Sequence, residues 1–167
     1  KNSKGDLYCF SKKAALEKYD SLHDRFTGIK LEKAGNIVQK PMIDSNDRLW
    51  IMDNNGGLDV YIPAATGFTR LKNFASSLGY VYDYFLVEGK IYVVTDQRRL
   101  YGINDRLEAE YITTLKANVR HMIVFNKLFV FANTQKGYQV YDRNFDPVNT
   151  LDAVMAPLKE TTIDALC

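Results

Sequence analysis

The chain has 167 residues, of which 46% are apolar and 25% charged, with 22 basic side chains against 20 acidic ones. A chain of this size and composition is typical of a soluble globular domain, which needs no disulfide or metal ion to hold its core. No apolar run approaches the ~18 residues of a transmembrane helix, so we expect no membrane span. The net charge of +2 is spread along the chain and provides no field for a polyanion, so nucleic acid is not an expected partner.

The chain has only two cysteines, Cys9 and Cys167, and no Cys-x-x-Cys pair or Cys/His cluster that indicates zinc. An Asn-x-Ser/Thr glycosylation acceptor does not occur either. These observations predict a cytoplasmic protein.

One short apolar pattern recurs four times, with starts 42, 42 and 37 residues apart. The copies are Leu7-Tyr8-Cys9-Phe10, Leu49-Trp50-Ile51-Met52, Ile91-Tyr92-Val93-Val94 and Leu128-Phe129-Val130-Phe131. A leucine follows nine residues after each of the first three starts, and the fourth copy is one residue out of phase. A regular internal period of this length predicts a repeat architecture.

Each repeat is predicted to contain four short strands, for example 37–43, 48–52, 58–62 and 68–72. These runs are rich in Val, Ile, Tyr and Phe and are bounded by turn-forming residues. The second strand is apolar almost without interruption, which indicates cover on both faces. Residues 11–19 would favour a helix in isolation, but they match the phase of the next repeat, so we predict a strand there. The predicted fold class is all-β, with sheets of four antiparallel strands.

A period near 40 residues with four strands per repeat resembles a β-propeller, and about four blades are expected in this chain. The predicted units are 1–35, 36–78, 79–117 and 118–151, and the tail 152–167 supplies a closing or next-blade strand at 161–166. Two arrangements remain open at this point. The four units either close into a small ring or form a section of a larger propeller. We expect the section, because Lys1 begins within a blade and is not a start methionine.

Two finer resemblances follow from particular residues. Tyr19-Asp20 and Tyr141-Asp142, with Asn104-Asp105 as a looser match, stand where WD-repeat proteins place Trp-Asp after the third strand. The run from Asp44 through Trp50 to Ile51, followed by Asn55-Gly56-Gly57-Leu58, is similar to a repeat of propeller sensor domains in bacterial two-component regulators. The second resemblance implies a periplasmic or extracellular location as an alternative to the cytoplasm.

The turns between the second and third strands are the predicted binding residues, because a propeller gathers these turns around its channel. The set comprises Lys12, Lys13, Asp53, Asn54, Asn55, Asp96, Arg98, Arg99, Gln135 and Lys136. The excess of basic side chains favours an acidic peptide or a phosphate as ligand. The alternative interpretation is ordinary polar turn chemistry.

The aromatic residues divide into two predicted groups. Tyr8, Trp50, Tyr92 and Phe129 occupy one repeated position, which indicates packing between blades. Tyr80, Tyr82 and Tyr84 crowd one strand, where they predict an exposed aromatic patch for a protein partner.

No set of catalytic residues is apparent in the sequence. Its two histidines, His23 and His121, have no nucleophile placed beside them, and Gly56-Gly57 alone is no phosphate loop. We therefore expect no enzyme, no cofactor and no metal site. The predicted function is a propeller scaffold that binds partner proteins. The alternatives are a ligand-sensing propeller of an extracytoplasmic receptor and a propeller enzyme.

Overall fold

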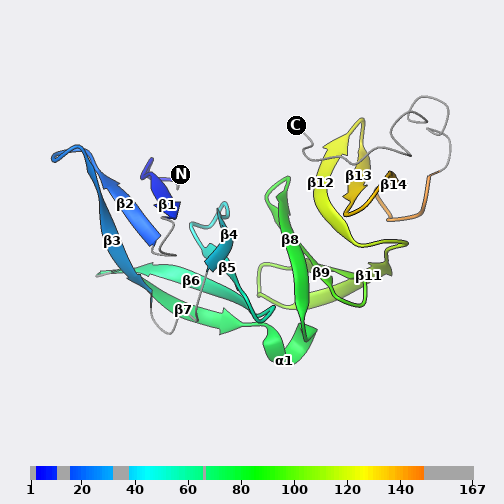
Figure 1. Cartoon of the computed structure of the whole chain (residues 1–167), viewed down its shortest axis with the longest axis horizontal. Helices are drawn as coiled ribbons and strands as arrows, with labels where there is room; N and C mark the ends of the chain where they lie inside the picture. Colours follow the sequence, from blue (N-terminus) through cyan, green and yellow to red (C-terminus); the bar gives the residue numbers. More distant parts are fainter. Residues whose placement is uncertain (1–2, 11–15, 32–37, 66, 149–167) are drawn as a thin grey trace. The chain divides into compact units, whose positions relative to one another are not determined.

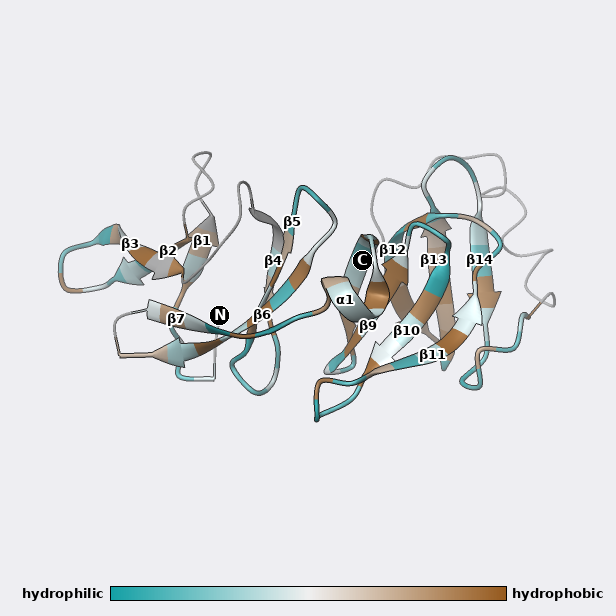
Figure 2. Cartoon of the chain, turned by 90° about the horizontal axis from the view of Figure 1, so that it is seen from below, coloured by the Kyte–Doolittle hydropathy of each residue, from teal (hydrophilic) through white to brown (hydrophobic). Residues whose placement is uncertain are grey.

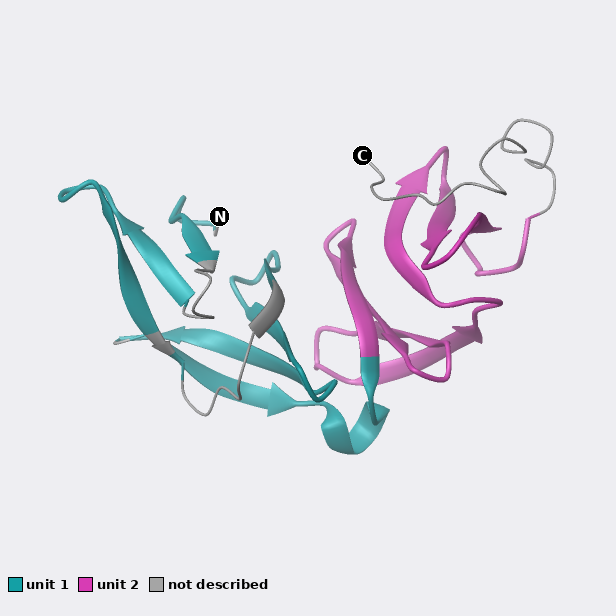
Figure 3. Ribbon diagram, viewed as in Figure 1, with its two compact units in different colours: residues 1–81 teal, residues 82–167 magenta. Residues whose placement is uncertain are grey.

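A computed structural model describes residues 3–10, 16–31, 38–65 and 67–148 (Figure 1). The chain forms two compact units, 1–81 and 82–167 (Figure 3). Lys12, Lys13 and the predicted strand 161–166 lie outside the described residues.

Strands make up nearly all of the regular structure in the first unit. Its elements are β1 (Tyr8–Phe10), β2 (Leu16–Asp20), β3 (Arg25–Leu31), β4 (Val38–Ile43), β5 (Leu49–Asp53), β6 (Leu58–Ala64), β7 (Gly67–Asn73) and α1 (Ala75–Leu78). Strands β1 to β3 form one antiparallel blade, and β4 to β7 form a second. A short parallel pairing of Lys30 with Gly67 and of Leu31 with Phe68 joins the two blades into one sheet.

The second unit repeats the same plan. Its strands are β8 (Val81–Val87), β9 (Lys90–Thr95), β10 (Arg99–Ile103), β11 (Ala109–Thr114), β12 (Val119–Phe125), β13 (Leu128–Asn133) and β14 (Tyr138–Tyr141). Strands β8 to β11 form an antiparallel sheet of four, and β12 to β14 form one of three. We refer to the four sheets as blades 1 to 4 in chain order.

The predicted all-β fold of antiparallel blades is confirmed, with four strands in blades 2 and 3 and three described strands in blades 1 and 4. The four strands expected at 37–43, 48–52, 58–62 and 68–72 correspond to β4, β5, β6 and β7, with ends that differ by one or two residues. Residues 16–20 form strand β2, as the repeat predicts. The short helix α1 and the β3–β7 pairing were not predicted. The helix has four residues, and no helix in the described part of the chain is long enough to cross a membrane.

The cores lie between the two blades of each unit, and the second strands of blades 2, 3 and 4 are buried along most of their length. Strands β5, β9 and β13 each carry at least four consecutive buried residues, whereas the outer strand β11 has none. In the first unit, Tyr8 of blade 1 packs edge-on against Phe68 of blade 2, with centroids 5.8 Å apart. In the second unit, Tyr92 of blade 3 packs edge-on against Phe129 of blade 4 at 5.7 Å. Figure 2 shows hydrophilic residues gathered in the connecting turns.

One type of hairpin turn recurs in both units. Its first residue is Asp44, Asp53, Asn104 or Asp142, and the Oδ1 atom of that residue accepts hydrogen bonds from the backbone N–H groups two and four positions later, at 2.8–3.0 Å. The fourth residue has a positive φ in every case: 59° at Asp47, 73° at Gly56, 60° at Leu107 and 62° at Phe145. Asp and Asn favour such turns because a short side chain reaches its own downstream backbone.

Candidate functional site

Three segments of the second unit meet at one end of its strands. They are the β9–β10 turn (residues 95–99), the β11–β12 connection (115–120) and the β13–β14 turn (133–138). The Arg98 Nη1 atom donates to the Lys116 carbonyl at 2.7 Å, and the Leu115 N–H donates to the Arg98 carbonyl at 2.9 Å. The Thr134 N–H donates to the Asn118 carbonyl at 2.9 Å. We call this surface the basic face.

Gln139 joins two of the three segments, the β11–β12 connection and the β13–β14 turn. Its Oε1 atom accepts the Lys116 N–H at 2.7 Å and the Tyr141 hydroxyl at 3.0 Å. Its Nε2 atom donates to the Ala117 carbonyl at 3.1 Å and to Asn133 Oδ1 at 2.7 Å. Gln139 is 7% exposed, so every polar atom of this buried amide is satisfied by the turns that it joins. The basic face is therefore built on a rigid polar network.

The basic face carries an excess of positive charge. Within its described segments, a single acidic residue, Asp96, accompanies five basic ones, Arg98, Arg99, Lys116, Arg120 and Lys136. Four of the basic residues are exposed, and Arg120 is half-buried because its Nη2 atom donates to the Thr134 carbonyl at 2.8 Å. A surface with this charge attracts carboxylate and phosphate groups.

Buried polar atoms also gather at this end of the unit. The hydroxyl of Thr95, the side-chain oxygen of Asn118 and the hydroxyl of Tyr138 are buried and have no hydrogen-bond partner among the described residues. Thr95 is 3% exposed. Buried polar groups are nearly always paired, so three in adjoining segments indicate a place where polar groups of a ligand or ordered water complete the structure.

The structure brings together only part of the predicted binding set. Asp96, Arg98, Arg99, Gln135 and Lys136 share the basic face, as the linked turns show. Asp53, Asn54 and Asn55 belong to the first unit, where Asp53 caps its own turn by accepting the N–H groups of Asn55 and Gly57. Lys116, Arg120 and Gln139 were missed, because two of them lie in a connection between blades and the third reads as an ordinary polar strand residue.

The predicted aromatic patch needs correction at one of its three positions. Tyr80 and Tyr82 are exposed, by 49% and 36%, but Tyr84 is fully buried. Burial raises the pKa of Tyr84 well above its ordinary value. From Tyr84 onward β8 enters the core, where the next residue, Phe85, packs with blade 4. Tyr80 lies against the backbone of Gly56, where an added Cβ atom would come within 2.6 Å of its ring.

The two histidines occupy different environments. His23 Nδ1 lies 2.6 Å from Asp20 Oδ2 in an exposed turn, and His121 lies half-buried on β12. Within the described ranges, no group of three His, Cys, Asp or Glu side chains is arranged to hold a metal ion.

No protein-family model matches the chain, and no curated protein matches it in sequence. Solved structures do resemble it. The extracellular domain assigned to a one-component system of B. thetaiotaomicron is 13% identical, with a TM-score of 0.56 over 89% of this chain and 28% of that one. The dihydro-heme d1 dehydrogenase NirN is 11% identical, with a TM-score of 0.65 over 86% of this chain and 34% of that one. A streptogramin B lyase is 11% identical, with a TM-score of 0.60 over 88% of this chain and 51% of that one.

These similarities show the fold, which is that of β-propeller blades. The chain spans between 28% and 51% of the length of these three structures. They also contradict one prediction. We expected the chain not to be an enzyme, yet two of the three propellers that it resembles are a dehydrogenase and a lyase, so this fold gives no ground for excluding catalysis.

Proposed function

We propose that this chain is the recognition part of a β-propeller, and that its basic face binds an acidic segment of a partner protein. The observation that carries the proposal is the excess of exposed basic side chains over a turn network in which three buried polar atoms have no partner among the residues that the structure describes. Backbone and side-chain bonds already hold the turns in place, so binding requires little ordering of the protein.

The test is a fluorescence titration of the full chain with a labelled hexaglutamate peptide. Changing Arg99 and Lys116 to glutamate reverses two charges on the basic face without removing a side-chain hydrogen bond described above. We expect the double variant to weaken binding by about tenfold or more, and wild-type binding to weaken as salt is added, because exposed charges are screened.

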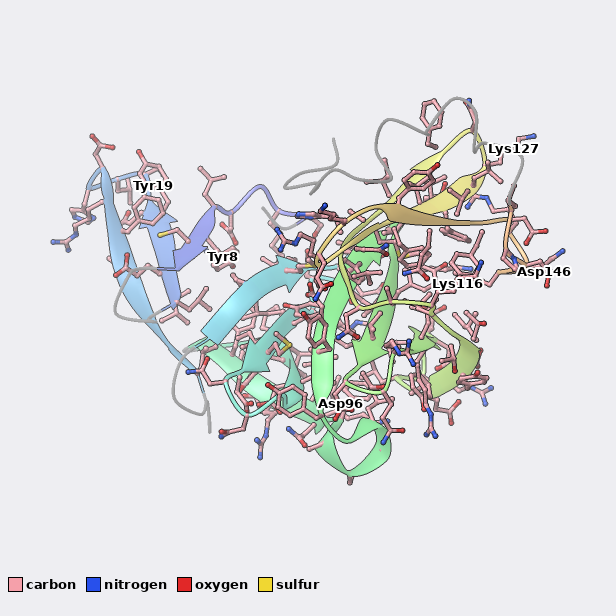
Figure 4. The ribbon with its side chains drawn as sticks, turned by 45° about the vertical axis from the view of Figure 1, so that its right-hand side comes forward. Tyr8, Tyr19, Asp96, Lys116, Lys127 and Asp146 are labelled. Carbon is pink, nitrogen blue, oxygen red and sulfur yellow. The ribbon has the colours of Figure 1, made fainter. Side chains whose placement is uncertain are left out.

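A matched control changes Arg106 and Lys127 to glutamate. Arg106 lies in the β10–β11 turn and Lys127, labelled in Figure 4, lies in the β12–β13 turn, so this pair alters the net charge equally but outside the three segments of the basic face. Binding should stay within about twofold of wild type. Equal loss in both double variants, or loss in neither, would contradict the proposal. Competition by inorganic phosphate alone would assign the face to a free anion.

A second candidate function is a ligand-sensing propeller outside the cytoplasm. It is favoured by the similarity to an extracellular sensor domain and by one turn in blade 2. There the buried Asp44 accepts four hydrogen bonds, among them Arg48 Nε at 2.6 Å and Trp50 Nε1 at 2.8 Å. These residues carry the resemblance to two-component-regulator repeats.

The sensor proposal is tested by sequencing the gene on both sides of the coding segment. A membrane-spanning segment followed by a kinase or DNA-binding region in the same reading frame is expected for a sensor. A reading frame that lacks both would remove this candidate and leave the cytoplasmic location as the prediction to pursue.

A further inference from the structure

A second candidate site lies in the same unit, at the strand ends opposite the basic face. Strand β9 leads away from Lys90 and β10 returns to Ile103, so the β8–β9 and β10–β11 turns share this end. A cleft of about 520 Å³ opens there between blade 3 and the turn that follows β14. Its size falls within the range of small-molecule sites.

A glycine in the cleft lining allows a neighbouring side chain to pack closely over the strand. Gly102 lies in the middle of β10, paired with Tyr92 on one side and Glu110 on the other. A Cβ atom at this position would lie 3.3 Å from Ile112 Cδ1. A glycine within a strand often marks a place where another group approaches the backbone closely. Here the group that approaches is the Ile112 side chain, and the residues paired with Gly102 on either side are an aromatic and a carboxylate.

An arginine of the chain lines the cleft and forms an ion pair there. Arg143 donates to both carboxylate oxygens of Glu88, with Nη1–Oε2 at 2.5 Å and Nη2–Oε1 at 3.0 Å. The guanidinium carbon also lies 5.1 Å from the centroid of the Phe129 ring. A carboxylate and an aromatic ring together form a good site for an organic cation. Here the two groups hold a guanidinium that comes from the turn after β14.

The surroundings strengthen the preference for a cation. Phe145 stacks on Phe129, with centroids 4.4 Å apart and an interplanar angle of 9°, and Tyr92 closes the aromatic wall at 5.7 Å from Phe129. Asp105 and Glu110 add carboxylates to the lining, which with Glu88 holds three carboxylates against two cations, Lys90 and Arg143. The hydrogen bond from Arg143 lowers the pKa of Glu88, so its carboxylate is ionised at neutral pH. Arg143 and Glu88 are 41% and 54% exposed, which leaves the pair accessible from solvent.

We propose that this cleft binds an organic cation, a guanidinium or ammonium group on a short apolar stem, which takes the place of Arg143 on Glu88 and Phe129. Arg143 is then an internal competitor that must move aside, and it lowers the apparent affinity of the cleft for its ligand. This inference is independent of the basic face, since it rests on different residues and on the opposite charge.

The experiment is calorimetric titration of the full chain with agmatine, which carries a guanidinium and an ammonium group on a four-carbon stem. Pentanoate and 1-pentanol serve as an anionic and a neutral probe of similar length. Agmatine should bind and the other two should not. Arg143→Gln should tighten agmatine binding by about tenfold, because the competitor is removed, and Glu88→Gln should weaken it by about as much.

Lys127→Gln is the control, because this neighbouring turn residue does not line the cleft. It should leave the affinity unchanged, and thermal melts of every variant should show that each one folds. The proposal is overturned if agmatine does not bind, if 1-pentanol binds as well as agmatine, or if Arg143→Gln weakens the binding. Tighter binding of pentanoate would instead make Arg143 the anchor of an anion site.

Discussion

Buried polar side chains on the third strands are paired with a tyrosine two positions later. The Tyr61 hydroxyl donates to Asp59 at 3.3 Å in blade 2, and the Tyr141 hydroxyl donates to Gln139 at 3.0 Å in blade 4. Residues two apart in a strand share a face, so the hydroxyl satisfies a polar group that the packing of the blade has removed from water. The same pair therefore serves the third strands of blades 2 and 4, whereas the Tyr19 hydroxyl of blade 1 donates to Asp24 at 2.7 Å.

The buried phenol of Tyr61 predicts how the free energy of unfolding changes at alkaline pH. Burial, with the nearby charge of Asp59, raises the pKa of Tyr61 to about 12. The folded chain keeps the phenol proton above pH 10, where an unfolded tyrosine loses it, so the free energy of unfolding must fall as the pH rises from 10 to about 12. Tyr61→Phe should make this decline shallower in urea titrations across that window. The exposed Tyr111→Phe is the control, and an equal effect of both variants would refute the assignment.

At the scale of elements, the connection between blades 3 and 4 depends on one side chain. Gln139→Leu leaves the Lys116 N–H and the Ala117 carbonyl without their buried partner, which should cost about 2–3 kcal/mol in the free energy of unfolding. Denaturant titration measures this loss. The exposed Gln135→Leu in the adjoining turn should change stability by less than about 0.5 kcal/mol. Comparable stabilities of the two variants would show that the hydrogen bonds of Gln139 do not contribute to the free energy of unfolding.

The strands and turns differ from the strand pairing in how far the local sequence predicts them. The strands were predictable, because the alternation and spacing of Val, Ile, Tyr and Phe repeat in every blade. The hairpin turns were predictable as well, since Asp53 to Gly57 has the residues that a tight turn requires. The parallel pairing of β3 with β7 was not, because it depends on the register of residues 37 positions apart.

The candidate sites were predictable only in part. Arg98 and Arg99 stand out as a basic pair in a turn, and the period places them in register with Lys136. The role of Gln139 was not predictable from the local sequence, because a glutamine in a strand can be buried and hydrogen-bonded or exposed to solvent. Arg143 reads as a turn residue and Phe145 as an apolar residue of a fourth strand, and only folding places them against Phe129.

At the scale of the molecule, the two compact units predict that damage to one remains local. Trp50 is fully buried, donates to Asp44 and stacks on Phe74 at 5.8 Å. Trp50→Ala should cost the first unit roughly 3–5 kcal/mol. Hydrogen exchange should then show lost protection in β4 to β7 and unchanged protection in β12 to β14.

Phe131→Ala, at a fully buried position of the second unit, supplies the reciprocal test. It should lower protection in β8 to β14 and leave β4 to β7 unchanged. If either substitution lowers protection throughout the chain, the two units unfold as one cooperative body.

The recurring hairpin turn has a consequence for how such a protein changes over evolutionary time. Its shape is set by the first side chain, by backbone N–H groups and by one positive φ, and the bonds that define it use no side chain at the second or third position. Substitutions at those two positions therefore alter what a loop presents while the hairpin keeps its form. A lineage can acquire new specificities at the ends of these blades by point mutation, and a protein engineer can randomise the same positions in a library.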